Sequence, residues 1–246
     1  GRMGFRNIDD IKRAVKLPNL KVKGVMTHFS RSYEKGSAGE EATENETEEF
    51  DRMVAELELD GSVIRHIANS AAAVRFPWTR KNMVRIGSLT YAEDIKGLDP
   101  QRELKPVMKS FESRVAIIER NVPALSPVGY DGLQRMRRDG TSTTATVRVG
   151  YNEGFPEMAF SRDMRVLIRG RKFPVIGKTS MNMVVIDVTD QDKKDPVQLG
   201  DEVVLIGKQG DKEITLEEFA TQSGTGITAL ILMLNRASIK KEIVTD

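Results

Sequence analysis

The chain has 246 residues, in which 38 Lys and Arg stand against 36 Asp and Glu and 39% of the residues are hydrophobic. This balance is typical of a globular protein and excludes a fully disordered chain, while the absence of cysteine excludes a disulfide scaffold. The longest apolar runs, residues 183–186 and 229–234, are far shorter than the roughly 20 residues of a membrane-spanning helix.

The first part of the chain alternates helical and strand patterns. Ile8, Ile11 and Val15 have helical spacing, and residues 21–26 predict a short strand that ends at a polar Thr-His pair. Residues 36–39 are rich in Gly and Ser and predict a loop. Residues 40–57 predict a helix whose acidic run is its solvated face.

The same alternation continues up to about residue 105. Residues 63–67 predict a second strand, residues 68–73 open a helix with polar caps, and residues 83–86 predict a third strand ended by Gly87. Alternating strands and helices are the signature of a parallel sheet or barrel. We therefore predict that residues 1–105 form part of a βα barrel.

After Pro106 the apolar pattern changes to a period of two. Strands are predicted at residues 111–117, 144–149, 164–168, 175–176, 183–188 and 202–206. One late helix is indicated by Thr215 and Glu218, which have capping-box spacing. Residues 106–246 are thus predicted to form a β-rich domain, so that the fold class is α/β followed by all-β.

The only two histidines of the chain both lie near the ends of predicted strands, His28 after the first and His66 on the second. The carboxyl ends of parallel strands carry the active sites of βα folds. A purely structural interpretation, with each histidine hydrogen-bonded near a strand end, also fits. Ser70 and Gly87 offer backbone N–H groups that suit a phosphate, but a helix cap and a turn would use the same residues.

Nine short motifs resemble those of one enzyme family in their order and spacing. They are Gly1-Arg2-Met3-Gly4, Thr27-His28-Phe29, His66-Ile67-Ala68-Asn69-Ser70, Arg85-Ile86-Gly87, Leu104-Lys105-Pro106-Val107-Met108, Gly150-Tyr151, Ser180-Met181, Asp187-Val188-Thr189 and Gly200-Asp201-Glu202-Val203. Each motif is short, but nine in register are specific. Along nearly its whole length the sequence resembles the alanine racemases.

This resemblance implies a pyridoxal-phosphate (PLP) enzyme with an N-terminal βα barrel and a C-terminal β domain, working as a head-to-tail homodimer on a small amino acid. Racemisation removes the Cα proton from one face and returns a proton to the other, so it needs an imine to the cofactor as an electron sink and two bases. In the family one base is the cofactor lysine and the other is a tyrosine, which Tyr151 matches.

The resemblance also assigns roles to other residues. His28 and Arg85 match the groups that stabilise the tyrosine phenolate, and Arg85 also faces the cofactor ring nitrogen. Arg2 matches an arginine that binds the substrate carboxylate, and Met181 a residue whose backbone contacts substrate. The positions that match cofactor contacts are His66, Asn69, Ser70, Arg85, Gly87 and Ser88. Tyr151 and Met181 would come from the partner subunit.

The sequence also departs from the family pattern. It contains no Val-Lys-Ala-Asn-Ala-Tyr-like motif, which in the family carries the cofactor lysine, so we expect this chain to be an N-terminally incomplete and inactive part of a racemase. Lys241 and its neighbours stand where the family has a phosphate-holding tyrosine. Asn182 replaces a usual Asp, and residues 177–182 look more like the broad-spectrum amino-acid racemases.

Other interpretations stay open. A non-catalytic protein that keeps the racemase fold as a binding module fits the missing lysine motif. A nucleic-acid role for Arg135, Arg137 and Arg138 is a weaker alternative, because clustered arginines in a turn are usually solvated charge; we expect no nucleic-acid, membrane or metal partner. No targeting segment follows Gly1, so the compartment is open, with the cytoplasm as default and the periplasm as alternative. Because a closed βα barrel takes about 250 residues, we expect open strand edges and aggregation or partner dependence.

Overall fold

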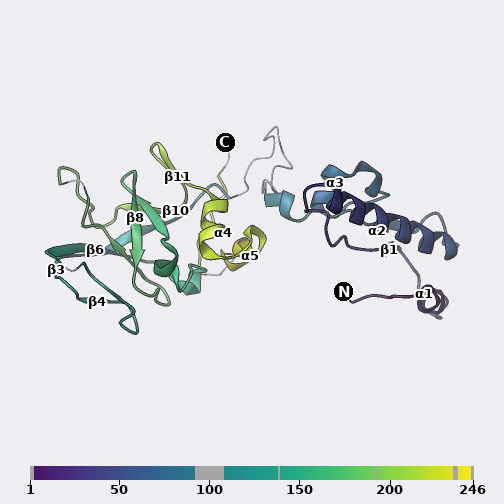
Figure 1. Cartoon of the computed structure of the whole chain (residues 1–246), viewed down its shortest axis with the longest axis horizontal. Coiled ribbons are helices and arrows are strands. Elements are labelled where there is room, and N and C mark those ends of the chain that lie inside the picture. Colours follow the sequence, from purple (N-terminus) through teal and green to yellow (C-terminus); the bar gives the residue numbers. More distant parts are fainter. Residues whose placement is uncertain (1–2, 92–107, 138, 192, 235–237, 245–246) are drawn as a thin grey trace. The chain divides into compact units, whose positions relative to one another are not determined.

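A computed structural model describes residues 3–91, 108–137, 139–191, 193–234 and 238–244. The chain divides into two compact units, Gly1–Val107 and Met108–Asp246. Figure 1 labels the α-helices and several strands of the two units.

The N-terminal unit is built around a parallel strand pair. Its elements are α1 (Ile8–Val15), β1 (Gly24–Met26), α2 (Ser37–Glu56), β2 (Ile64–His66), α3 (Ser70–Arg75) and two 3-10 helices, η1 (Pro77–Thr79) and η2 (Ser88–Tyr91). Strand β1 pairs with β2 in parallel, with Val25 opposite Arg65 and Met26 opposite His66. The first two of the three predicted strands and the three predicted helices are therefore confirmed, with shorter strands than expected.

Two details of this unit differ from the sequence prediction. The predicted loop at residues 36–39 is wrong, because α2 begins at Ser37 and contains Gly39. A Cβ on Gly39 would lie 2.3 Å from the carbonyl oxygen of Glu34, so this glycine is needed where the helix packs on the loop before it. Glycine has a low helix propensity, but any other residue at this position would clash with the Glu34 carbonyl.

The third predicted strand is also wrong. Residues 83–86 form no strand, although they follow β2 through two backbone hydrogen bonds: Asn82 donates to the Arg65 carbonyl at 3.1 Å and Arg85 donates to the Ala68 carbonyl at 3.0 Å. The Asn82 side chain accepts from the Arg65 amide as well. A side chain thus takes the place of one backbone acceptor beside β2, and regular strand pairing does not form here.

The C-terminal unit is a closed antiparallel barrel. Its strands are β3 (Phe111–Pro123), β4 (Pro127–Val128), β5 (Gln134–Arg135), β6 (Thr141–Val147), β7 (Arg165–Ile168), β8 (Arg171–Ile176), β9 (Val184–Asp187), β10 (Glu202–Gln209) and β11 (Lys212–Ile214). The main sheet has the order β11-β10-β3-β6-β9-β8-β7, and β10 also pairs with β7. This last pairing joins the two sides of the sheet, so β10, β3, β6, β9, β8 and β7 form a complete circuit.

The barrel interior holds the core of this unit. Strands β7, β9 and β10 carry runs of consecutive buried residues, among them Val166, Leu167 and Ile168 on β7 and Val204 and Leu205 on β10, so both faces of these strands are covered. Helix α4 (Leu216–Ser223) begins as predicted, with Thr215 Oγ1 accepting from the Glu218 amide at 3.0 Å. Other short elements are the 3-10 helices η3 (Tyr151–Glu153) and η4 (Ala159–Arg162).

Helix α5 (Ile227–Leu234) was not predicted from the sequence. Its residues are apolar nearly all round and show no 3.6-residue period, so the run was recognised only as an apolar stretch. Gly154 explains how this helix is packed. A Cβ at Gly154 would lie 2.7 Å from the Met233 carbonyl oxygen, and the residue has φ of 89°, which favours glycine.

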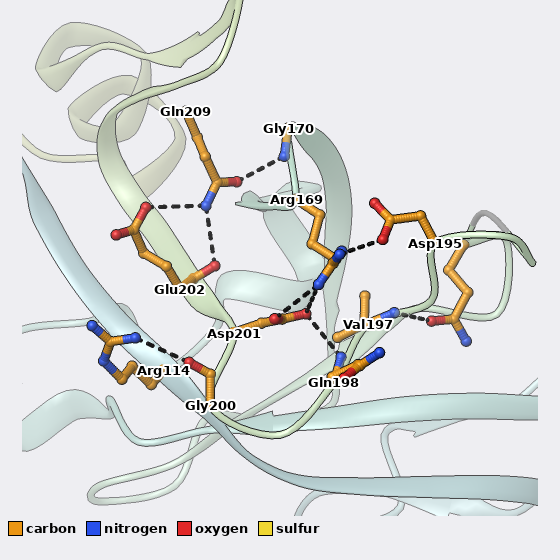
Figure 2. A network of polar contacts seen from close by, with 11 residues as sticks. Arg114, Arg169, Gly170, Asp195, Val197, Gln198, Gly200, Asp201, Glu202 and Gln209 are labelled. Atoms are coloured by element: carbon orange, nitrogen blue, oxygen red, sulfur yellow. Dashed lines mark hydrogen bonds and ion pairs between the residues drawn. The ribbon is translucent and has the colours of Figure 1, made fainter.

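A network of polar contacts lies at the closing seam between β7 and β10 (Figure 2). Arg169, directly after β7, donates to the carboxylates of Asp195 and Asp201. Asp201 in turn accepts from the Gln198 amide at 2.8 Å. On β10, the Gln209 side chain accepts from the Gly170 amide at 2.9 Å and donates to the Glu202 carbonyl. The Gly200–Val203 motif of the resemblance is therefore part of the seam.

Strands β1 and β2 and the neighbouring segment 83–86 expose apolar side chains. Met26, Ile64, Val84 and Ile86 are all more than one third exposed. Burying such side chains stabilises by about 25 cal/mol per Å², so we expect this chain on its own to associate with itself. Sedimentation velocity measures this, and Met26→Lys should weaken it more than Leu199→Lys on the C-terminal unit. A monodisperse, cooperatively melting monomer would contradict the expectation.

Candidate active site

Arg85 connects the ends of the two parallel strands. Its Nη1 donates to His66 Nδ1 at 2.9 Å and to the His66 carbonyl at 2.8 Å. Its Nη2 donates to the Thr27 carbonyl at 2.9 Å and to His28 Nδ1 at 3.2 Å. Because arginine can only donate, both imidazoles accept through Nδ1. The structure therefore brings three predicted site residues, His28, His66 and Arg85, into one cluster.

The charge of this cluster resides on Arg85. Burial lowers the pKa of His66, and the positive charge of Arg85 lowers it further, so that the imidazole is neutral. Burial also lowers the pKa of Arg85 below its ordinary value, but the guanidinium remains protonated near neutral pH. The cluster is thus a fixed cation held between two hydrogen-bond acceptors.

We expect His66 to titrate below the ordinary histidine pKa of 6.5. The unfolded chain then binds the proton more tightly than the fold does. The resulting contribution to stability is complete above about pH 6.5 and is lost as the pH falls through the lowered pKa. Arg85→Gln should raise the pKa of His66, because it removes the positive charge and keeps a hydrogen-bonding side chain. NMR titration measures both values, with His66→Asn to assign the signal; an unaltered chain with His66 at or above 6.5 would contradict this.

A second group of polar residues surrounds the start of α3. Asn69 caps the helix, with Oδ1 accepting from the Ala72 amide at 3.0 Å and from Ser32 Oγ at 2.9 Å. Ser70 Oγ accepts from the Gly87 amide at 2.8 Å, which leaves the hydroxyl proton of Ser70 for another acceptor. The start of α3, at Asn69 and Ser70, is thus linked by a hydrogen bond to Gly87.

This group has donors that suit an anion. Asn69 Nδ2 is buried and has no hydrogen-bond partner among the described residues, and a buried donor without an acceptor is costly. Ser88 Oγ lies 3.3 Å from the hydroxyl of Tyr33, longer than is usual between two hydroxyls. Amide and hydroxyl donors of this kind fit the oxygens of a phosphate.

The C-terminal unit holds Tyr151 and Met181 on two loops that are joined through their backbones. The Tyr151 amide donates to the Ser180 carbonyl at 3.2 Å, and the Asn152 amide donates to the Met181 carbonyl at 2.9 Å. The side chains of Tyr151 and Met181 are 44% and 59% exposed. Both predicted residues are therefore presented to solvent from one fixed pair of loops.

Gly150 allows the two loops to approach so closely. A Cβ at this position would lie 2.3 Å from the Ser180 carbonyl oxygen and 2.4 Å from the Met181 carbonyl oxygen. The Gly150 amide is also held, because it donates to Glu153 Oε2 at 3.0 Å. The Gly150-Tyr151 and Ser180-Met181 motifs are thus two sides of a single backbone contact.

The remaining predicted residues have other outcomes. Arg2 and Arg138 lie outside the described residues. Arg137 forms ion pairs with Asp187 and Asp190, and Arg135 donates to the Leu125 carbonyl, so the contacts of these two arginines are within the fold. The Asp187-Val188-Thr189 motif provides part of this arrangement, since Thr189 Oγ1 donates to Asp187 Oδ1 at 2.5 Å.

The described part of the chain has neither a membrane-spanning helix nor a cluster of metal ligands. None of the described helices is long and apolar enough to cross a membrane. Within the same part of the chain, no three His, Cys, Asp or Glu side chains are grouped so that they could hold a metal ion.

Comparison with known families assigns both units. The model of the alanine racemase N-terminal domain matches residues 1–94, and that of the alanine racemase C-terminal domain matches residues 108–241. The chain belongs to the alanine racemase family. The fold, an N-terminal barrel domain followed by a C-terminal β-rich domain, is that of the family.

Curated members of the alanine racemase family are longer than this chain. The lysine racemase of Proteus mirabilis is 34% identical over 227 residues, which are 92% of this chain and 52% of that protein. A broad specificity amino-acid racemase of Pseudomonas taetrolens is 35% identical over 232 residues, which are 94% of this chain and 54% of that protein. The chain thus spans about half the length of these relatives.

Solved structures of alanine racemases agree with this fold. The alanine racemase of Bacillus anthracis with bound L-Ala-P gives a TM-score of 0.81 at 29% identity, covering 96% of this chain and 60% of that one. The enzyme of Bartonella henselae with covalently bound pyridoxal phosphate gives a TM-score of 0.77 at 25% identity, covering 93% and 59%.

Proposed function

We propose that this chain is part of a PLP-dependent amino-acid racemase that interconverts L- and D-alanine and other amino acids. The observation that carries the proposal is the Arg85 cluster, a half-buried cation held by His28 and His66 beside a group of phosphate-type donors. The chain itself lacks the cofactor lysine motif, so its activity depends on a lysine supplied from outside these residues.

The residues of the N-terminal unit would hold the cofactor. Asn69, Ser70 and Ser88 would bind the phosphate through the side-chain donors described above. The Gly87 amide, which donates to Ser70 Oγ here, would turn from that hydroxyl to the phosphate. Arg85 would face the ring nitrogen, and His66 would fix the guanidinium by accepting from it. When bound, PLP supplies the electron sink that makes a Cα proton removable.

The residues of the C-terminal unit would act on the substrate. Tyr151 would take or return the Cα proton on one face, and the backbone of Met181 would contact the amino acid. His28 and Arg85 would stabilise the phenolate of Tyr151, since a cation beside a phenol favours its ionised form. Arg2 would bind the substrate carboxylate. We propose a homodimer in which Tyr151 and Met181 serve the cofactor of the partner subunit.

The substrate range is proposed to be wider than alanine. Residues 177–182 carry Asn182 where alanine racemases usually have Asp, and relatives of similar identity are named as lysine and broad specificity racemases. A panel of L-amino acids, followed by polarimetry, would rank the substrates.

The experiment joins this chain to a lysine-bearing N-terminal segment of a relative. The product should bind PLP, seen by its visible absorbance, and should racemise L-alanine. An intact, cofactor-loaded protein with no racemisation of any amino acid in the panel would contradict the proposal.

A non-catalytic protein of the same fold is the second candidate, favoured by the absent lysine motif and by Lys241 standing where the family has a phosphate-holding tyrosine. The same joined protein distinguishes the two. A racemase exchanges the Cα proton of L-alanine for deuterium in D₂O, whereas a binding module that holds PLP leaves that proton in place.

A further inference from the structure

The loop after β1 brings a tyrosine to the candidate phosphate group, although no motif of the sequence singled it out. Tyr33 is half-buried, and its hydroxyl lies 3.3 Å from Ser88 Oγ, 55 residues further along the chain. Two hydroxyls bonded to each other usually lie about 2.7–2.8 Å apart. The longer distance leaves the protons of both hydroxyls available to a stronger acceptor, such as an anion.

The position of Tyr33 is fixed from both sides. One guanidinium nitrogen of Arg75, on α3, donates to the carbonyls of Ser32 and Glu34 at 2.6 Å each, and these are the residues that flank Tyr33. Arg75 also lies over the ring of Phe76, with its Cζ 4.7 Å from the centroid. The helix that begins at Ser70 therefore holds the backbone of the tyrosine.

A buried side-chain contact adds to this anchor. Ser32 is fully buried and its Oγ donates to Asn69 Oδ1 at 2.9 Å. This bond occupies Oδ1 of Asn69, and the buried Nδ2 of the same residue has no partner within the described part of the chain. Ser32 thus contacts Asn69 at the start of α3, and Tyr33 contacts Ser88 at the start of η2. Both contacts are with the candidate phosphate group.

We propose that Tyr33 is a further phosphate-binding residue of this site, donating its hydroxyl to the cofactor phosphate together with Ser88; this rests on the proposed function. The ligand class is a phosphate monoester, and the same donors would accept free phosphate.

The test compares pyridoxine 5′-phosphate with pyridoxine on the full chain by equilibrium dialysis. Neither compound has an aldehyde, so neither forms an imine with surface lysines. Tyr33→Phe removes only the hydroxyl and should weaken binding of the phosphorylated compound about tenfold or more, with pyridoxine unchanged. Tyr130→Phe, an exposed tyrosine of the C-terminal unit, is the matched control and should alter neither. Inorganic phosphate should compete for the unaltered chain.

The outcomes distinguish the role of Tyr33 from the existence of the proposed phosphate site. If Ser70→Ala lowers the preference for the phosphorylated compound and Tyr33→Phe does not, the phosphate site stands and the role of Tyr33 is overturned. If the unaltered chain shows no preference for the phosphorylated compound, or if Ser70→Ala leaves that preference intact, the proposed phosphate site is overturned as well. An equal loss for both compounds in Tyr33→Phe would show a structural role and would also overturn the inference.

Discussion

Replacing Tyr151 with phenylalanine is expected to lower the racemisation rate of the joined, cofactor-loaded protein about 10²- to 10⁴-fold, the range of a lost general acid or base. The loss should be the same from either enantiomer, because L- and D-amino acids have equal free energy in water and the equilibrium constant is one. Tyr151 is 44% exposed and its backbone is held by Ser180, so the change removes a hydroxyl without removing a core side chain.

Exchange of the Cα proton for deuterium distinguishes the loss of one base from the loss of both. A two-base reaction leaves one base in place when Tyr151 is changed, so the variant should still exchange the Cα proton of one enantiomer in D₂O while interconversion is lost. Tyr130→Phe is the matched control and should keep both activities. A Tyr151→Phe variant that exchanges and racemises both enantiomers at the unaltered rate would refute the assigned role.

Gly150→Ala is expected to separate the two loops that carry Tyr151 and Met181. Its Cβ would meet backbone oxygens at 2.3 and 2.4 Å, and backbone cannot move aside as a flexible side chain can. Overpacking costs about 1–3 kcal/mol and each lost hydrogen bond about 1 kcal/mol, so we expect a destabilisation of about 3 kcal/mol with a large loss of activity.

Hydrogen exchange tests this change locally. The amides of Tyr151 and Asn152 should lose protection in Gly150→Ala, because their bonds to the opposite loop are broken. Gly226→Ala is the matched control in the same unit, since a Cβ there meets nothing within 4 Å. Unchanged protection of both amides in Gly150→Ala would show that the crowding is relieved elsewhere.

Part of the N-terminal site could be predicted because it depends on the order of neighbouring strands along the chain. Strand ends of a parallel pair meet at one edge, so the placing of His28 beside His66 follows from the order of elements alone. Residue spacing could not show that Arg85 bonds to both histidines, because its position depends on a segment whose pairing with β2 is interrupted by the Asn82 side chain. Tyr33 and Ser88 meet only in the folded chain, and no spacing rule predicts a contact over 55 residues.

The C-terminal unit shows a similar limit. Alternation predicted the strands of the barrel, but alternation carries no information about closure, which depends on β10 pairing with both β3 and β7. Helix α5 was missed because a uniformly apolar run has no period. Gly150 was noted only as part of a motif, and its crowded position requires the opposite loop to be known.

The closing seam has a consequence for how this protein is made. Strand β10 ends at Gln209, about 100 residues after β3 begins at Phe111, so a ribosome that adds 5–20 residues per second takes roughly 5–20 s between them. During that time β3 has an edge that awaits β10, and β7 has another from the moment it is made; such edges pair readily with other chains. Synthesis that stops before Glu202 would leave the nascent domain as an open sheet, the form in which a chaperone would have to hold it.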